Sequence, residues 1–334
     1  MLHVCPNGSG FALRQTWIYI GYGLWLKIDR YSTTVNTSRV SGRFRRIASI
    51  FTALVLLAAT VVAGGAARAG EAGRYPWLTT TPSGTVESRV AVPAGWKRLP
   101  APSESFAAWL RGLPVKPGRP EVLLFNGSKK WNQEAHHLVL EVDVGKRDRQ
   151  QCADAVMRLR AEFQHQAGRD SDICFCFTDG VPARWTDWKN GMRPRILARK
   201  TTWGKTATAD ASYTSFRRYL DIVFSYAGTL SLARELDRVP DPGRIEAGDV
   251  FIQGGSPGHA VIVVDVAEDK QGRRAVLLAQ SYMPAQDIHV LRNPKSPDSP
   301  WYVIEGDGPL VTPEWDFPAG SLRRFTAAGC PKSR

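Results

Sequence analysis

The segment at residues 248–265, GDVFIQGGSPGHAVIVVD, most constrains what this chain can fold into. A short apolar run at 250–252 precedes a turn rich in glycine and proline, residues that favour the backbone angles of turns. The β-branched run at 260–264 is typical of a buried strand. The sequence therefore predicts two neighbouring strands joined by a glycine-rich turn.

One polar residue, His259, stands at the start of the second predicted strand. An imidazole fixed at the edge of a sheet suits a general base. The preceding glycine turn, which includes Gly258, would let a substrate approach. A lone histidine is more often a structural residue, so its function depends on partners elsewhere in the chain.

The N-terminal part of the sequence differs from the rest. Residues 1–46 have the character of a non-native upstream extension ending in a basic n-region, and 47–69 combine an apolar h-region with a small-x-small cleavage signal. We expect cleavage after Ala69 and one domain over 70–334, with a C-terminal tail rich in proline and tryptophan. The alternative is an uncleaved membrane anchor at 47–63, since this run is close to spanning length. Either reading predicts an exported protein, periplasmic or extracellular.

The positive charge of the chain is concentrated in this N-terminal segment. The formal net charge is +13, and residues 1–69 hold eight Lys or Arg and a single Asp. Removing them roughly halves the net charge. No basic stripe with interleaved aromatic residues follows, so we do not expect nucleic-acid binding.

Four cysteines remain after residue 69: Cys152, Cys174, Cys176 and Cys330. An even number in an exported protein permits disulfides. Cys174 and Cys176 lie in an apolar, strand-like run, and we expect two buried thiols there. The spacing of cysteines and histidines matches no zinc template, so we expect no metal and no cofactor.

Runs of strands and intercalated helices predict an α+β fold, with an antiparallel sheet packed against helices. Helical spacing is found at 105–110, at 148–166 with Asp148 as N-cap, and at 213–236 with a break at Gly228. Strands are predicted at 88–92, 121–125, 137–144, 173–177 and 275–282, besides the two described above.

Cys152 falls in the first turn of the predicted helix at 148–166. The partial positive charge at a helix N-terminus stabilises a thiolate. Cysteine on a helix, histidine on a strand and a polar residue on the next strand form the arrangement of papain-like hydrolases. Gln280 is the candidate third member, because its carbonyl would orient the imidazole; His289 is a rival.

Other residues are candidates for contacts with a substrate. Gln151 would donate a hydrogen bond to an oxyanion, as would the backbone N–H groups of the helix terminus. Tyr282 would line a cleft, although an aromatic residue more often serves packing. The pair His136-His137 has no acidic or thiol neighbour at ligand spacing, and we expect it at the surface.

Long motifs carry a resemblance to a known family. QQCADAVMRLRAEF, SFRRYLDIVFSYAGTLSL, GDVFIQGGSPGHAVIVVDVAED and LLAQSYMPAQDIHVLRNP resemble the DUF4846 family of uncharacterised bacterial exported proteins, over about residues 90–325. The GD…GHA segment also resembles the NlpC/P60 and wider papain-like superfamily, whose members cleave peptidoglycan stem peptides or related amides. That resemblance implies Cys152 as nucleophile and His259 as base. Unlike the typical Asp-Cys-Ser-Gly context, the cysteine here is followed by Ala153-Asp154.

These features lead to three alternative functions. The first is an exported cysteine amidase or peptidase acting on a cell-envelope amide, using Cys152, His259 and Gln280. The second is a non-catalytic protein of the same fold that binds an envelope peptide, glycopeptide or glycan. The third is a disulfide-linked envelope scaffold that uses Cys330.

Overall fold

The structure is a computed structural model that describes residues 16–19, 25–28, 75–78, 81–326 and 330. The chain divides into two units, Met1–Gly65 and Ala66–Arg334. The described part of the first unit is an antiparallel pair, β1 (Thr16–Tyr19) and β2 (Trp25–Ile28). The predicted h-region and cleavage site at 47–69 lie outside the described residues. In the part of the chain that is described, no helix combines the length and apolar character needed to span a bilayer.

The second unit is built on a nine-stranded antiparallel sheet. Its main path follows the order β4, β13, β12, β11, β10, β17, β9, while β14 adds to β12 and β3 adds to β11. The strands are β3 (Trp96–Arg98), β4 (His136–Val139), β9 (Asp237–Arg238), β10 (Val250–Gln253), β11 (His259–Asp269), β12 (Arg274–Gln280), β13 (His289–Leu291), β14 (Tyr302–Ile304) and β17 (Leu322–Arg324).

Both faces of the sheet are buried at β11, which explains the continuous apolar run in this strand. Ala260 and Ile262 belong to the larger hydrophobic core, whereas Val261 and Val263 belong to a second core on the opposite face. A strand with two covered faces needs apolar residues at every position, because successive side chains point to opposite sides. The alternation shifts at a bulge between Val263 and Asp265.

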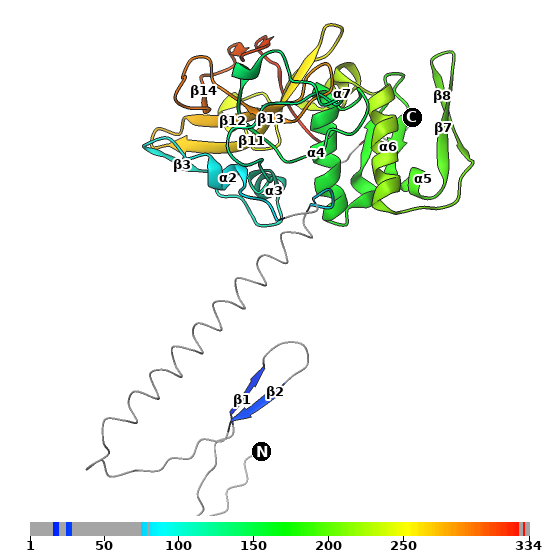
Figure 1. Ribbon diagram of the computed structural model, residues 1–334, viewed down its shortest axis with the longest axis horizontal. Helices are drawn as coiled ribbons and strands as arrows, with labels where there is room; N and C mark the ends of the chain where they lie inside the picture. Colours follow the sequence, from blue (N-terminus) through cyan, green and yellow to red (C-terminus); the bar gives the residue numbers. More distant parts are fainter. Residues whose placement is uncertain (1–15, 20–24, 29–74, 79–80, 327–329, 331–334) are drawn as a thin grey trace, which may run out of the picture. The chain divides into compact units, whose positions relative to one another are not determined.

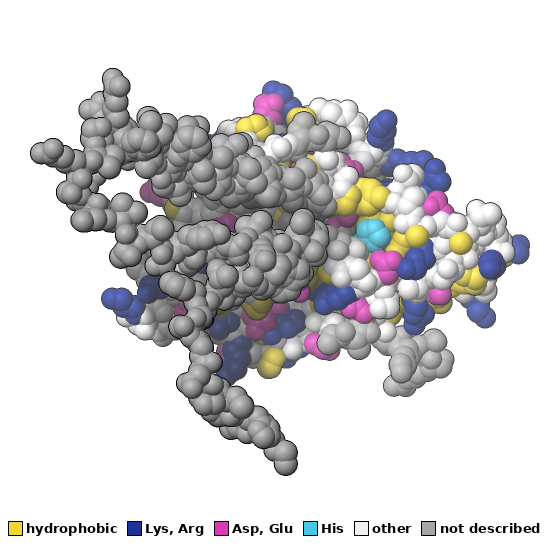
Figure 2. Space-filling model, turned by 90° about the horizontal axis from the view of Figure 1, so that it is seen from below, with side chains coloured by type: hydrophobic (Ala, Val, Ile, Leu, Met, Phe, Trp, Pro, Cys, Tyr) yellow, Lys and Arg dark blue, Asp and Glu magenta, His cyan; other side chains and the backbone are white. Residues whose placement is uncertain are grey.

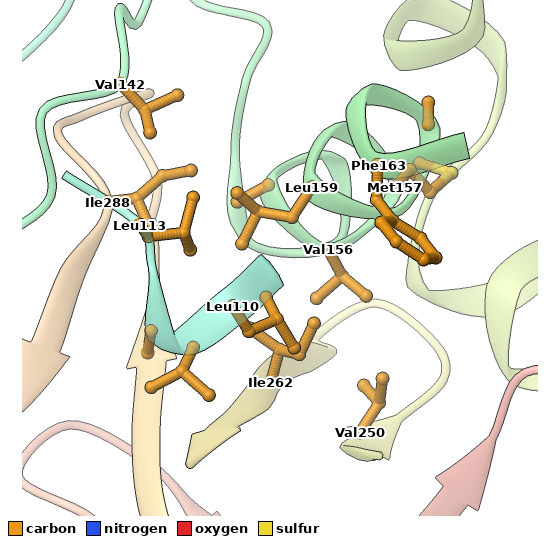
Figure 3. Packing of buried hydrophobic residues seen from close by; sticks show 14 of the residues in the cluster. Leu110, Leu113, Val142, Val156, Met157, Leu159, Phe163, Val250, Ile262 and Ile288 are labelled. Atoms are coloured by element: carbon orange, nitrogen blue, oxygen red, sulfur yellow. The ribbon is translucent and has the colours of Figure 1, made fainter. Parts of the chain in front are cut away.

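The helices of this unit are α2 (Val86–Arg89), α3 (Phe106–Arg111), α4 (Cys152–Gln166), α5 (Trp185–Lys189), α6 (Tyr213–Tyr226) and α7 (Thr229–Glu235). Of these, α3, α4 and α7 pack against the sheet on the face that carries the larger core, whereas α5 and α6 lie beyond α4 (Figure 1). Figure 3 shows Val156 and Leu159 of α4 directed toward Leu110 of α3 and Ile262 of β11. This packing holds α4 against the strand that begins with His259.

Small elements complete the unit. Single 3-10 turns are η1 (Gln133–Ala135), η2 (Asp170–Asp172) and η3 (Pro242–Arg244), and short hairpins join β5 (Cys174–Cys176) to β6 (Pro182–Arg184), β7 (Met192–Leu197) to β8 (Lys200–Lys205) and β15 (Leu310–Val311) to β16 (Asp316–Phe317). The β7–β8 hairpin projects beyond α5 and α6 (Figure 1). Where Figure 2 shows described atoms, basic and acidic side chains are interspersed on the surface.

The helix boundaries agree with the sequence in part. The break at Gly228 is confirmed, since α6 ends before it and α7 begins after it. The predicted cap at Asp148 is wrong, because Gln151 is the N-cap of α4. The predicted strand at 88–92 is also wrong: Thr85 Oγ1 accepts a 3.2 Å hydrogen bond from the Ser88 N–H and caps the short helix α2.

Two predictions about cysteine and histidine burial are corrected. Cys174 forms a disulfide with Cys330, so the expected pair of free thiols reduces to Cys176 alone. Chain folding brings these cysteines together across 156 residues, which no local spacing indicates. His136 was expected at the surface, but it is 3% exposed and its Nε2 lies 3.0 Å from the Pro120 carbonyl.

The helix–sheet core predicts a contrast between two leucines. Leu159 of α4 is fully buried, whereas Leu197 of the projecting hairpin is 59% exposed. Leu159→Ala removes buried methyl groups and leaves a cavity, so it should lower the free energy of unfolding by about 2–5 kcal/mol. Leu197→Ala should change it by less than about 0.5 kcal/mol. Urea unfolding followed by circular dichroism measures both, and equal losses would contradict this placement of α4.

Candidate active site

Hydrogen bonds tie the start of α4 to the end of β12. The Ser281 hydroxyl donates to the Gln150 carbonyl at 2.9 Å, and the Ala285 N–H donates to Asp148 Oδ1 at 2.7 Å. Ser281 follows the last residue of β12, and Gln150 lies two residues before Cys152. These bonds fix the partly exposed Cys152, the first residue of α4, beside the strand ends.

Cys152 and His259 lie at the same end of β11. The thiol of Cys152 interacts with the backbone N–H of Ala260, the residue that follows His259. Strand alternation assigns Ala260 to the face covered by α4, and His259 to the face that carries Val261 and Val263. The sulfur therefore reaches the backbone of β11 from the helical side, while the imidazole extends from its first residue.

His259 is held by a hydrogen bond and by aromatic rings. Its side chain is buried, and its Nε2 lies 2.8 Å from Oε1 of Gln280, the last residue of β12. The Tyr282 and Trp315 rings lie 4.8 and 5.3 Å from the imidazole, measured between ring centroids. The structure thus brings together His259, Gln280 and Tyr282, three of the residues singled out from the sequence.

His289, the rival third residue, takes a different place. Its Nε2 lies 3.3 Å from Nε2 of Gln280, and its Nδ1 lies 2.8 Å from the Asp287 carbonyl. His289 therefore approaches the amide nitrogen of Gln280, whereas His259 approaches the amide oxygen. Gln280, and not His289, is the hydrogen-bond partner of His259.

Burial keeps both the thiol and the imidazole uncharged at neutral pH. Burial raises the pKa of Cys152 to about 11, with Asp154 as a smaller cause, although nearby backbone N–H groups oppose this shift. Burial also lowers the pKa of His259 to about 4, against the effect of the Gln280 hydrogen bond. The helix terminus was expected to favour a thiolate, but in this structure the loss of water outweighs its partial charge.

Gln151 and Gly258 serve local structure. The side-chain amide of Gln151 donates to Asp148 Oδ1 at 3.0 Å, so this donor is engaged within the loop before α4. A side chain at Gly258 would bring its Cβ within 2.5 Å of Thr229 Oγ1 on α7. Glycine at this position thus permits close packing between the turn and α7.

Sequence reasoning missed a buried ion pair beside Gln280. Lys130 Nζ pairs with Glu314, and the two side chains are only 2% and 4% exposed. Glu314 Oε2 also accepts a 2.7 Å hydrogen bond from Gln280 Nε2. Lys130 stands in the polar loop sequence GSKKWNQ, which carries no signal of burial.

A surface cleft of about 580 Å³ opens next to the His259 ring. Its walls include Tyr282 and Trp315, both in contact with that ring, and Trp131, which is 87% exposed. Thr312, Pro313, Glu314 and Asp316 complete the lining. Aromatic rings beside polar groups offer stacking and hydrogen bonding to a ligand.

Within the described ranges, a single group of three side chains has metal-ligand spacing, namely Cys176, Glu235 and Cys330. The sulfur of Cys330 is bonded to Cys174, so the group offers one thiol and one carboxyl group in this state. It is formed by β5, α7 and the C-terminal segment, and not by the elements that carry Cys152 and His259.

Comparison with known proteins assigns a family. The sequence model described as DUF4846, domain of unknown function (4846), matches residues 86–324, which include every residue of the candidate site. Neither the curated proteins nor the solved structures contain a significant match.

The low pKa of His259 predicts an acid-sensitive fold. Because the folded state binds this proton only near pH 4, while the unfolded chain binds it near pH 6.5, stability should fall as the pH drops through that window. The contribution is at most roughly 3 kcal/mol, at 1.36 kcal/mol for each pKa unit. His259→Gln removes the titrating ring, so its urea midpoint should decline less between pH 6.5 and 4 than that of the wild type. Parallel declines would show that His259 is not held neutral by burial.

Proposed function

We propose that this chain, which belongs to the DUF4846 family, is an exported papain-like cysteine amidase or peptidase that acts on a cell-envelope amide. The pattern at residues 47–69 supports export. The substrate class is a peptidoglycan-type peptide or glycopeptide, in keeping with the resemblance of the GD…GHA segment to the NlpC/P60 superfamily.

The observation that carries this proposal is the hydrogen bond between His259 and Gln280, at the strand end where Cys152 lies. Gln280 Oε1 can only accept, so Nε2 of the neutral imidazole must carry the proton. The lone pair is then on Nδ1, which can act as a base. Cys152 supplies a nucleophile beside the same strand, against the Ala260 N–H.

The proposed reaction begins when Cys152 Sγ attacks the amide carbonyl and its proton passes to His259 Nδ1 through water at the end of β11. The resulting oxyanion accepts hydrogen bonds from backbone N–H groups at the start of α4. The imidazolium then donates its proton to the leaving amine as the C–N bond breaks, and a thioester remains. Water attacks the thioester while His259 takes its proton, which releases a carboxylic acid and restores the thiol.

The energetics favour attack that is concerted with proton transfer. Moving a proton from a thiol of pKa about 11 to an imidazole of pKa about 4 costs roughly 10 kcal/mol, at 1.36 kcal/mol for each unit. Even if the two charges came within about 4 Å of each other, their attraction would return only about 4 kcal/mol at an effective dielectric constant of 20. A resting thiolate–imidazolium pair is therefore disfavoured, and bond formation to the carbonyl must offset the remaining cost.

The cleft supports a peptide or glycopeptide as the substrate. Trp131, Tyr282 and Trp315 present aromatic rings on which a sugar or an apolar side chain can stack. Asp316, on the exposed part of the lining, can accept hydrogen bonds from hydroxyl or amine groups.

The uncharged states of Cys152 and His259 also favour a second candidate function. In this function, the protein binds an envelope glycan or peptide in the cleft without cleaving it. A thiol that stays protonated and an imidazole that stays neutral at pH 7 also suit a site that only binds. The two functions differ in whether Cys152 is required.

The hydrolase predicts a strict requirement for Cys152. A protein of residues 70–334 should cleave isolated peptidoglycan peptides and release new amine groups. Mass spectrometry of the products measures this cleavage. Cys152→Ala should reduce this rate at least about 10³-fold, because it removes the nucleophile. Cys176→Ala, which removes the other free thiol in the described residues, should leave the rate within about twofold. Cleavage that survives Cys152→Ala would exclude the cysteine mechanism, and binding without cleavage by the wild type would establish the second candidate.

A further inference from the structure

We propose that Glu314, held in place by Lys130, is a positioning residue that fixes the orientation of the Gln280 amide and thereby the tautomer of His259. The catalytic effect of this tautomer rests on the hydrolase function proposed above. The hydrogen bonds that set the tautomer are present whether or not the protein cleaves an amide.

The orientation of the Gln280 amide follows from two neighbours that face its nitrogen. Glu314 Oε2, a carboxylate oxygen, lies 2.7 Å from Gln280 Nε2 and can only accept a hydrogen bond. His289 donates from Nδ1 to the Asp287 carbonyl at 2.8 Å, so its other nitrogen, Nε2, carries a lone pair. This Nε2 lies 3.3 Å from Gln280 Nε2. Because Glu314 Oε2 and His289 Nε2 are both acceptors, the NH₂ group of Gln280 must face them.

With its nitrogen committed, Gln280 turns its oxygen to His259. Oε1 accepts from His259 Nε2 at 2.8 Å, which leaves Nδ1 as the unprotonated nitrogen of the neutral ring. A flipped amide would present its NH₂ group to His259 and its oxygen to the Glu314 carboxylate. Two acceptors would then face each other in a buried site, which is strongly unfavourable.

Lys130 makes it possible for a carboxylate to stand in this position. Its Nζ pairs with Glu314 and lies 3.3 Å from His289 Nε2, so one ammonium group contacts both neighbours of Gln280. Asn132 Nδ2 adds a 3.4 Å contact to the other carboxylate oxygen. Burying a charge pair is costly, and replacement by apolar groups of similar size is often neutral or stabilising. A role in orienting Gln280 accounts for the presence of this pair beside the candidate site.

The Lys130 cation disfavours the charged form of His259, and the carboxylate of Glu314, which pairs with Lys130, would offset this effect during the proposed reaction. The Gln280 amide transmits the effect of this carboxylate, since a hydrogen bond donated to a carboxylate strengthens the one accepted at the amide oxygen. The imidazolium formed when Cys152 loses its proton would be stabilised at Nε2–H. The contacts of Glu314 with Gln280 and Lys130 give it an effect on the orientation and charge of the site.

The test reads the tautomer directly, by nitrogen NMR of the wild-type protein labelled with ¹⁵N-histidine. The His259 signals are assigned by their loss in His259→Gln. In the wild type, Nε2 should be the protonated nitrogen and Nδ1 the bare one. Glu314→Gln keeps the size but lets residue 314 present either oxygen or nitrogen to Gln280, so the Nδ1–H tautomer should become populated. Glu305→Gln removes an exposed carboxylate from the same C-terminal segment and should leave the His259 signals unchanged.

Two further variants separate orientation from folding. Lys130→Met combined with Glu314→Met removes both charges together, avoids an unpaired buried charge, and should give the same mixture of tautomers in a folded protein. In a Gln280→Met background, Glu314→Gln should add no further change, because the link to His259 is already gone. Thermal unfolding and amide NMR spectra verify that each variant is folded.

The results decide the proposal independently of hydrolysis. If folded Glu314→Gln and the double variant both keep the wild-type His259 tautomer, the positioning role is excluded. If the tautomer shifts and the wild type also cleaves peptidoglycan peptides, Glu314→Gln should lower kcat about 10- to 100-fold and alter KM less than about threefold. If the tautomer shifts although the wild type cleaves nothing, the positioning role stands and only the hydrolase is lost.

Discussion

The burial of both faces of β11 is the constraint on which the rest of the structure depends. One set of its side chains packs under α4 and α3, and the other set enters a second core closed by the C-terminal strands. A strand held from both sides cannot shift register without exposing apolar side chains to water or forcing them into the wrong core. The backbone of His259, the first residue of β11, is therefore held in place. The same applies to Gln280, the last residue of the neighbouring strand β12.

This frame explains why the candidate site combines polar groups with little access to water. The imidazole of His259 lies between aromatic rings and a hydrogen-bonded glutamine, and its pKa falls because the charged form loses its hydration. The same loss of hydration raises the pKa of the thiol of Cys152. A helix terminus contributes only a partial charge, so it cannot compensate for removal from water.

Sequence patterns that reflect local chemistry predicted much of the fold and part of the site. The two strands around the glycine turn, the position of Cys152 at a helix start and the pairing of His259 with Gln280 follow from periodicity, turn residues and strand order. The α+β class with an antiparallel sheet is also confirmed. The resemblance to DUF4846 is borne out over residues 86–324.

Features that depend on distant parts of the chain were not predictable. The disulfide of Cys174 with Cys330 and the burial of His136 arise only when separate segments pack together. Asp148 is a residue type that often caps helices, but its carboxylate instead accepts a hydrogen bond from the Ala285 N–H of another loop. Burial of Lys130 depends on Glu314, and charged residues in polar loops are ordinarily solvated.

The separation between Lys130 and Glu314, 184 residues along the chain, has a consequence for biosynthesis. The segment that carries Glu314, Trp315 and strand β17 leaves the ribosome long after the segment that carries Lys130. Until it emerges, Gln280 has no carboxylate neighbour and the second core has no cover. The nascent polypeptide therefore cannot assemble this pocket until the segments around residues 130 and 314 have both been synthesised.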